Sequence, residues 1–105
     1  MDDIESCAMI DIRRVLRGKW ATVILWLLQD GTLHFGQIKR LLPSVTDANL
    51  TKDLRLLEEH GLVHREVYRE VPPKVEYSLT DLGRKFAPAL EALEEFANKF
   101  GAARS

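Results

Sequence analysis

The sequence predicts a mainly α-helical protein with a small β-ribbon, which places it in the α+β class. In the stretch 46–60, leucines recur at positions i, i+4 and i+7, the spacing of one face of an α-helix. Two stretches rich in β-branched and aromatic residues, 62–69 and 74–79, follow at once and are typical of paired strands. With 105 residues, the chain has the size of a single domain with one modest core.

Two helices are expected before this central stretch. Apolar residues are spaced as in a helix over about 8–17, and Gly18 ends it. The stretch 20–28 is apolar on almost every side, which is typical of a helix at the centre of a core. Trp20 and Trp26 are accordingly interpreted as core residues.

A helix-turn-helix pair is predicted over about residues 35–60. A short strand at 32–34 is expected to join the ribbon just before the first helix of the pair, which Pro43 stops. In the second helix, the Thr46 hydroxyl can accept a hydrogen bond from a free amide of the first turn. At the other end, Gly61 tolerates the positive φ of a helix terminus, so both ends of this helix are marked in the sequence.

The two strands are expected to form a hairpin over about 62–79 with a stiff tip. Pro72 and Pro73 restrict φ and remove two backbone donors, so the ladder of hydrogen bonds ends before the tip. Arg69 and Lys74 flank these prolines. A helix-turn-helix followed by a β-ribbon is the plan of a winged helix, in which the second helix enters the DNA major groove and the ribbon touches the backbone beside it.

A long last helix is predicted over about 81–100, with Thr80 as its cap. Its apolar stripe extends beyond what the other expected elements can cover, which favours a partner helix. Pro88 falls inside the predicted helix and is expected to kink it or to leave carbonyls near Arg84 unpaired.

The composition is that of a soluble protein, with 46% hydrophobic and 30% charged residues. The longest apolar run, Val23–Leu28, is too short to cross a bilayer, and the N-terminus is acidic where a secretory signal would be basic. We therefore expect a cytoplasmic protein without a membrane partner. The single cysteine, Cys7, argues against an internal disulfide framework and against a zinc site of several thiolates.

The charge balance limits the expected affinity for DNA. The net charge is −1, and the stretch 34–79 holds seven basic and seven acidic residues. Because DNA affinity comes largely from neutralising phosphates, we expect modest binding by one subunit and a need for two subunits.

Several short motifs, in a fixed order, carry a resemblance to a known family. They are Leu16-Arg17-Gly18-Lys19-Trp20, Asp30-Gly31 with Phe35, Leu50-Thr51-Lys52-Asp53-Leu54-Arg55-Leu56-Leu57-Glu58, Gly61-Leu62-Val63-His64-Arg65 and Val71-Pro72-Pro73-Lys74-Val75-Glu76-Tyr77-Ser78-Leu79-Thr80-Asp81-Leu82-Gly83. Together they resemble the HxlR family of bacterial transcriptional regulators over about residues 7–100. The resemblance implies a single winged helix-turn-helix domain, residues 1–105, that forms a homodimer through its first and last helices, about 8–17 and 81–100. The residues then expected at the dimer interface are Met9, Ile12, Phe86, Leu90, Leu93, Phe96 and Phe100.

The polar face of the helix 46–60, together with the wing, is the expected DNA-binding surface. Arg55 and Lys52 can pair with guanine edges or phosphates, and Asn49 with adenine. The full set of expected contacts is Lys39, Thr46, Asn49, Thr51, Lys52, Arg55, Arg69 and Lys74. The alternative is that these are ordinary solvated side chains. Asp47 also stands in the first turn, where the family often places a lysine, and an acid there would repel DNA.

Cys7 is the expected sensing residue. Several members of the family carry a cysteine at the start of the first helix that reacts with oxidants, quinones or aldehydes, and Cys7 falls at that place. A helix N-terminus and the nearby Arg13 and Arg14 favour the thiolate, whereas the acidic residues before Cys7 disfavour it. The family commonly has proline after this cysteine, and here Ala8 stands instead. The alternative is a small, passive residue at the dimer interface.

We therefore expect a homodimeric DNA-binding regulator, most simply a repressor, on a roughly palindromic operator with half-sites about one helical turn or a small multiple apart. Its signal is expected to be oxidant or electrophile chemistry at Cys7, or a small molecule. The alternative is a winged-helix protein-interaction module without specific DNA binding. No enzymatic activity or cofactor is expected, because the sequence contains no recognisable pair of nucleophile and base and no phosphate-binding loop. No metal site is expected either, because no cluster of ligands is recognisable and Gly61 ends the helix between His60 and His64.

Overall fold

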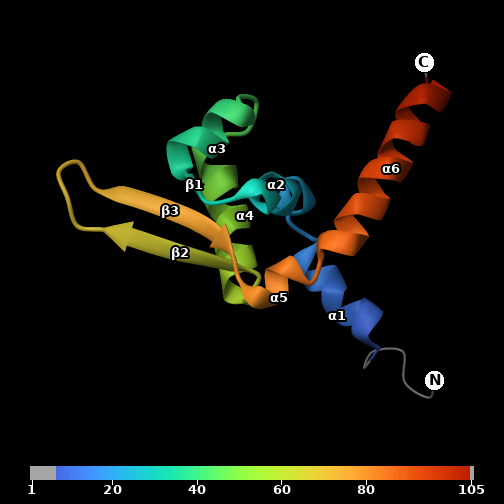
Figure 1. Ribbon diagram of the computed structural model, residues 1–105, viewed down its shortest axis with the longest axis horizontal. Coiled ribbons are helices and arrows are strands. Elements are labelled where there is room, and N and C mark those ends of the chain that lie inside the picture. The colour runs from blue at the N-terminus through green and yellow to red at the C-terminus, as the bar shows by residue number, and fades with distance from the viewer. Residues whose placement is uncertain (1–6, 105) are drawn as a thin grey trace.

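The computed structural model describes residues 7–104, which form a mainly helical fold with a small antiparallel sheet. The elements run in the order α1 (Ala8–Val15), α2 (Ala21–Leu27), the 3-10 turn η2 (Leu28–Asp30), β1 (Leu33–His34), α3 (Phe35–Leu41), α4 (Asp47–Glu59), β2 (Val63–Tyr68), β3 (Lys74–Leu79), α5 (Asp81–Arg84) and α6 (Ala87–Arg104). The β2–β3 hairpin projects from one side of the molecule and α6 from the other, with α2, α3 and α4 between them (Figure 1). The fold class predicted from the sequence is confirmed.

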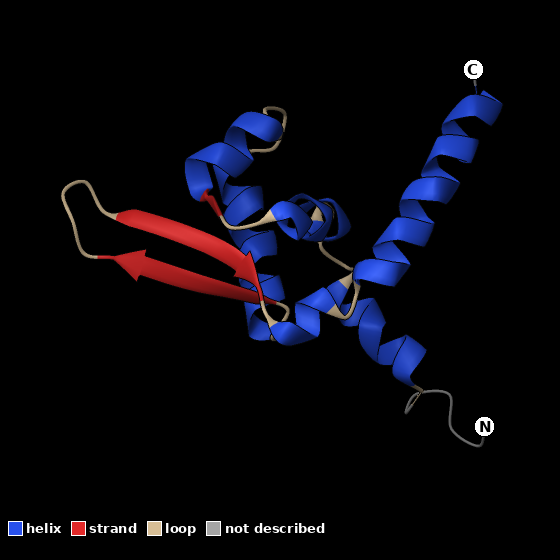
Figure 2. Ribbon diagram, in the orientation of Figure 1, coloured by secondary structure: helices blue, strands red, loops and turns tan. Residues whose placement is uncertain are grey.

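The sheet has three strands in the order β1-β3-β2, all antiparallel. Leu33 pairs with Tyr77 at one edge, which confirms the short strand expected before α3. On the other side, β2 and β3 pair from Val63 with Leu79 out to Tyr68 with Lys74. Figure 2 shows that this hairpin extends well beyond the helices, so its outer half is free of the core.

The core lies between α2, α3, α4 and the base of the hairpin. Ile24 and Leu25 of α2 are completely buried, which confirms a central helix. The leucine ridge expected on α4, composed of Leu50, Leu54 and Leu57, is also buried, so this helix presents only its opposite face to solvent.

Two expectations about α2 and α3 need correction. Trp26 is not a core residue: it is 43% exposed, and its indole N–H donates to the Glu94 carboxylate of α6 at 3.0 Å. At the start of α3, the sequence contains a cap that was not predicted. The His34 ring accepts a hydrogen bond through Nδ1 from the backbone N–H of Gln37. In return, the side-chain oxygen of Gln37 accepts from the backbone N–H of His34, so both backbone donors are satisfied.

The predicted last helix is two helices. α5 ends at Arg84 and α6 begins at Ala87, so Pro88 falls in the first turn of a new helix. Amides in that turn have no partner within the helix, so a proline there costs nothing and the expected kink does not arise. Leu90, expected at the dimer interface, is 2% exposed and belongs to the core of its own protomer.

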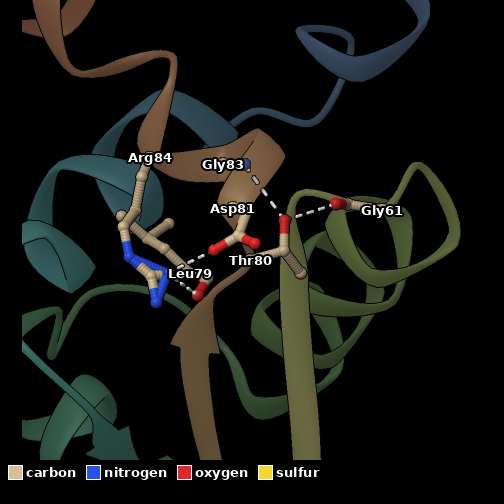
Figure 3. Close-up of polar contacts among 6 residues, drawn as sticks. All are labelled: Gly61, Leu79, Thr80, Asp81, Gly83 and Arg84. Atoms are coloured by element: carbon tan, nitrogen blue, oxygen red, sulfur yellow. Dashed lines mark hydrogen bonds and ion pairs between the residues drawn. The ribbon is translucent and has the colours of Figure 1, made fainter.

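The junction from β3 into α5 is fastened to the end of α4 by polar contacts (Figure 3). The Thr80 hydroxyl accepts from the Gly83 amide at 3.0 Å, as predicted for a cap, and donates to the Gly61 carbonyl at 2.6 Å. Arg84 donates to the Leu79 carbonyl and lies 3.7 Å from Asp81. Gly83 has no room for a side chain, because a Cβ there would lie 2.2 Å from the Leu62 carbonyl oxygen.

Candidate nucleic-acid interface

The outward face of α4 is built by the same periodicity that buries its leucines. Thr46 caps the helix, since its hydroxyl accepts from the Asn49 amide at 3.1 Å, and Gly61 ends it with a φ of 75°. Asn49, Lys52 and Arg55 are exposed on the side away from the core. Thr51, expected beside them, is half-buried, and Thr46 is exposed at the helix start. The structure thus brings most of the predicted α4 contacts onto one accessible surface.

Lys39 of α3 has an intramolecular role that the sequence did not reveal. Its ammonium donates to the Val45 carbonyl in the turn between α3 and α4 and lies 3.8 Å from an Asp47 carboxylate oxygen. Lys39 therefore stabilises the turn of the helix-turn-helix and partly offsets the charge of Asp47, the acid expected to repel DNA. Its part as a DNA contact stays a prediction.

Arg69 and Lys74 lie at the outer end of the hairpin, on either side of its tip, and both are exposed. Lys74 is 3.8 Å from the Glu76 carboxylate. Tyr68, which pairs with Lys74 across the hairpin, is exposed. A hydrogen bond to Glu76, together with the negative charge of that carboxylate, raises the pKa of the Tyr68 phenol above its ordinary value.

A buried carboxylate attaches α4 to the start of α2. Asp53, which is 4% exposed, accepts a hydrogen bond from the backbone N–H of Trp20 at 2.8 Å. Gly18 lies so close that a Cβ there would come within 2.9 Å of Asp53 Oδ1. Sequence reasoning counted Asp53 only as a negative charge. The signal that places it inward is its spacing of three residues from Leu50 and four from Leu57, on the side of the leucine ridge.

This attachment holds the α1–α2 turn beside the outward face of α4 and creates a groove of about 620 Å³. The groove is lined by Arg17, Gly18, Lys19, Asn49, Lys52, Asp53, Arg55, Leu56 and Glu59. Arg17 and Lys19 were not among the expected DNA contacts. They belong to the motif Leu16–Trp20, which contributed to the family resemblance but for which no function was predicted.

Cys7 lies immediately before α1 and is half-buried. Its carbonyl accepts from the amides of Ile10 and Asp11, so it occupies the N-cap position at which the thiol was expected. Arg13 and Arg14 lie in the last turn of the same short helix. The acidic residues that precede Cys7 lie outside the described part of the chain.

The remaining residues expected at a dimer interface divide into two groups. Ile12 and Phe86 are half-buried against the core of their own protomer. The exposed group is Met9, Leu93, Phe96 and Phe100. The rings of Phe96 and Phe100 stack with centroids 6.3 Å apart along α6, which leaves an apolar strip on a helix that projects from the rest of the protein.

Within residues 7–104, no group of three histidine, cysteine, aspartate or glutamate side chains is arranged to hold a metal ion. His60 interacts with the Leu56 carbonyl, and His64 with Glu66 at 3.1 Å. In the same range no helix combines the length and the apolar character that a membrane span needs.

Comparison with known proteins gives the family directly. Residues 15–105 match the model of the HxlR-like helix-turn-helix family. YdeP of Bacillus subtilis (strain 168), named an uncharacterized HTH-type transcriptional regulator, is 41% identical over 99 residues, or 94% of this chain and 77% of YdeP. A relative of the same description from Methanothermobacter thermautotrophicus is 44% identical over 100 residues, covering 95% of this chain and 76% of that protein.

The fold is shared with solved structures of regulators. The redox regulator HypR, in its oxidised form, is 42% identical and matches with a TM-score of 0.82 over 89% of this chain and 96% of HypR. The resemblance inferred from the motifs is confirmed, and the chain belongs to the HxlR-like helix-turn-helix family.

Proposed function

We propose that this protein is a cytoplasmic transcriptional regulator that binds double-stranded DNA through the outward face of α4. The observation that carries the proposal is the exposure of Asn49, Lys52 and Arg55 on a helix whose other face is buried. These side chains can donate to the base edges of guanine and adenine and to phosphate oxygens. The hairpin projects beside this helix, where Arg69 and Lys74 would contact the backbone next to the groove that α4 enters.

The functional unit we propose is a homodimer. Met9, Leu93, Phe96 and Phe100 leave apolar surface exposed on α1 and α6, and burial of such surface drives association. A two-fold dimer places two α4 helices on half-sites separated by about 34 Å, one turn of DNA, or a multiple of that distance. Two sets of contacts also compensate for the lack of a net positive charge on one protomer, whose net charge is −1.

We further propose that the bound dimer represses transcription and that an oxidant or electrophile acting at Cys7, or a small molecule, releases it. Cys7 lies at the start of α1, close to residues of the proposed interface, so a change in its oxidation state would alter the packing of two protomers. The relative HypR is described as a redox regulator, which supports this part of the proposal.

The test begins with selection of bound fragments from random-sequence DNA. Fluorescence anisotropy with the selected duplex then compares the wild type with Arg55→Ala and with Lys99→Ala, a control on α6. Loss of a base contact by Arg55 should weaken binding by about 1–3 kcal/mol, roughly 5- to 150-fold, while the control binds like the wild type. Unchanged affinity of Arg55→Ala would contradict the assignment of α4.

A protein-interaction module with no DNA target is the second candidate, favoured by the nearly neutral charge. The salt dependence of binding separates the two. Phosphate contacts make the affinity fall steeply with salt, by about 0.9 in log–log slope for each contact. A wild-type protein that binds no duplex at low salt, in either thiol state, would favour the interaction module.

A further inference from the structure

We propose that the turn between α1 and α2 is a third DNA-contacting element, in which Arg17 and Lys19 hold a backbone phosphate at the edge of the groove that α4 enters. The proposal rests on the function proposed above and adds to it a contact made outside the helix-turn-helix and the wing.

The placement of the turn is the first argument. Arg17 and Lys19 line the same groove as Asn49, Lys52 and Arg55, three of the α4 residues expected to reach DNA. When a helix lies in the major groove, the elements beside it face the sugar-phosphate backbone that borders the groove. The α1–α2 turn is therefore where a phosphate would lie, whereas base edges would be reached from α4.

The charges of the groove are the second argument. Its four cationic side chains, Arg17, Lys19, Lys52 and Arg55, form no ion pair with any residue of the described range 7–104. Of the eleven other basic residues, four have an acidic partner there, namely Lys39, Lys74, Arg84 and Lys99. Of the two acids in the groove, Asp53 is buried and bonded to the Trp20 backbone amide, and Glu59 is exposed one turn from Arg55 along α4 but forms no ion pair with it. The accessible charge is thus mainly positive and without an internal partner.

The rigidity of the turn is the third argument. The Asp53–Trp20 hydrogen bond and the close packing of Gly18 on Asp53 and Leu56 hold the backbone of the turn in place before any ligand binds. A contact that is already positioned loses less conformational freedom on binding. This turn also bears on the charge balance: the stretch 34–79 has seven basic and seven acidic residues, and adding Arg17 and Lys19 gives nine against seven.

The experiment uses the full chain, the duplex selected by the wild type and a mixed-sequence duplex of equal length. Arg17→Ala and Lys19→Ala are compared with Lys99→Ala, which removes the same charge from α6, after thermal unfolding and sedimentation show that all are folded and equally associated. The salt slope is the decrease in log affinity per unit increase in log salt concentration, and each lost phosphate contact should lower it by about 0.9. Between 50 and 200 mM salt, the affinity of such a variant should therefore fall by a factor that is roughly 3.5-fold smaller than for the wild type. The loss should be equal on both duplexes, because a phosphate contact carries no sequence information.

Phosphate ethylation interference locates the contact. In the wild type, ethylation of one backbone phosphate beside each half-site should weaken binding, and in the double variant Arg17→Ala/Lys19→Ala the same modification should have no further effect. If the wild type binds with a steep salt slope while both variants match Lys99→Ala, the contact by the α1–α2 turn is wrong and the proposed function stands. If the wild type itself binds no duplex, the function fails, and the contact fails with it.

Discussion

Replacing Asp53 with alanine should destabilise the protein although the residue is charged and lies in a groove open to solvent. Asp53 is 4% exposed, and its carboxylate accepts a hydrogen bond from the Trp20 backbone N–H at 2.8 Å. A hydrogen bond to a charged group contributes about 1.5–3 kcal/mol, and alanine would leave the Trp20 amide without that partner. For a domain of this size, each 1 kcal/mol shifts the melting temperature by about 4–8 °C, so we expect a decrease of roughly 6–24 °C.

The assay is thermal unfolding followed by circular dichroism, at one protein concentration because association raises the melting temperature. Glu59→Ala is the matched control, since Glu59 is an exposed acid of the same helix and groove and should change stability by no more than about 0.5 kcal/mol. Asp53→Asn should be less damaging than Asp53→Ala, because the amide oxygen can still accept from Trp20. Equal melting temperatures for Asp53→Ala and Glu59→Ala would refute the role assigned to this carboxylate.

Three further predictions concern other parts of the chain. Leu90→Ala should lower the free energy of unfolding by about 2–5 kcal/mol, because the side chain is buried in the protomer. Phe96→Ala should instead mainly weaken self-association, measured by sedimentation. The opposite pattern would place Leu90 at the interface. Thr80→Ala should lose about 1 kcal/mol, measured by urea unfolding, since it removes both the cap on Gly83 and the bond to Gly61; a variant as stable as the wild type would show that α5 needs no cap. Cys7→Ser should bind the selected duplex like the reduced wild type and should not release it on addition of diamide, whereas full release of the variant would remove Cys7 from the response.

The helix-turn-helix shows what local sequence determines. Thr46 and Gly61 mark the two ends of α4, and the spacing of its leucines identifies the buried face, because capping and helical periodicity depend only on residues a few positions apart. The two strands of the hairpin follow in the same way from β-branched and aromatic residues and from the prolines at its tip. The motif order was sufficient for the family. Of the side chains within α4 expected to reach DNA, Asn49, Lys52 and Arg55 are exposed and Thr51 is half-buried.

Contacts between different elements of the fold were decided only by tertiary structure. Lys39 lies against the turn at Val45, the Asp53 carboxylate reaches an amide 33 positions away at Trp20, and Leu90 packs into its own protomer. An apolar stripe on a helix indicates that its side chains are buried, but it does not indicate which surface covers them. A charged residue in the sequence likewise does not indicate which group it contacts. The sequence by itself therefore determined the elements and the outward face of α4. Tertiary packing decided that the α1–α2 turn, with Arg17 and Lys19, lies beside that face, because the hydrogen bond to Asp53 forms only when the helices are assembled.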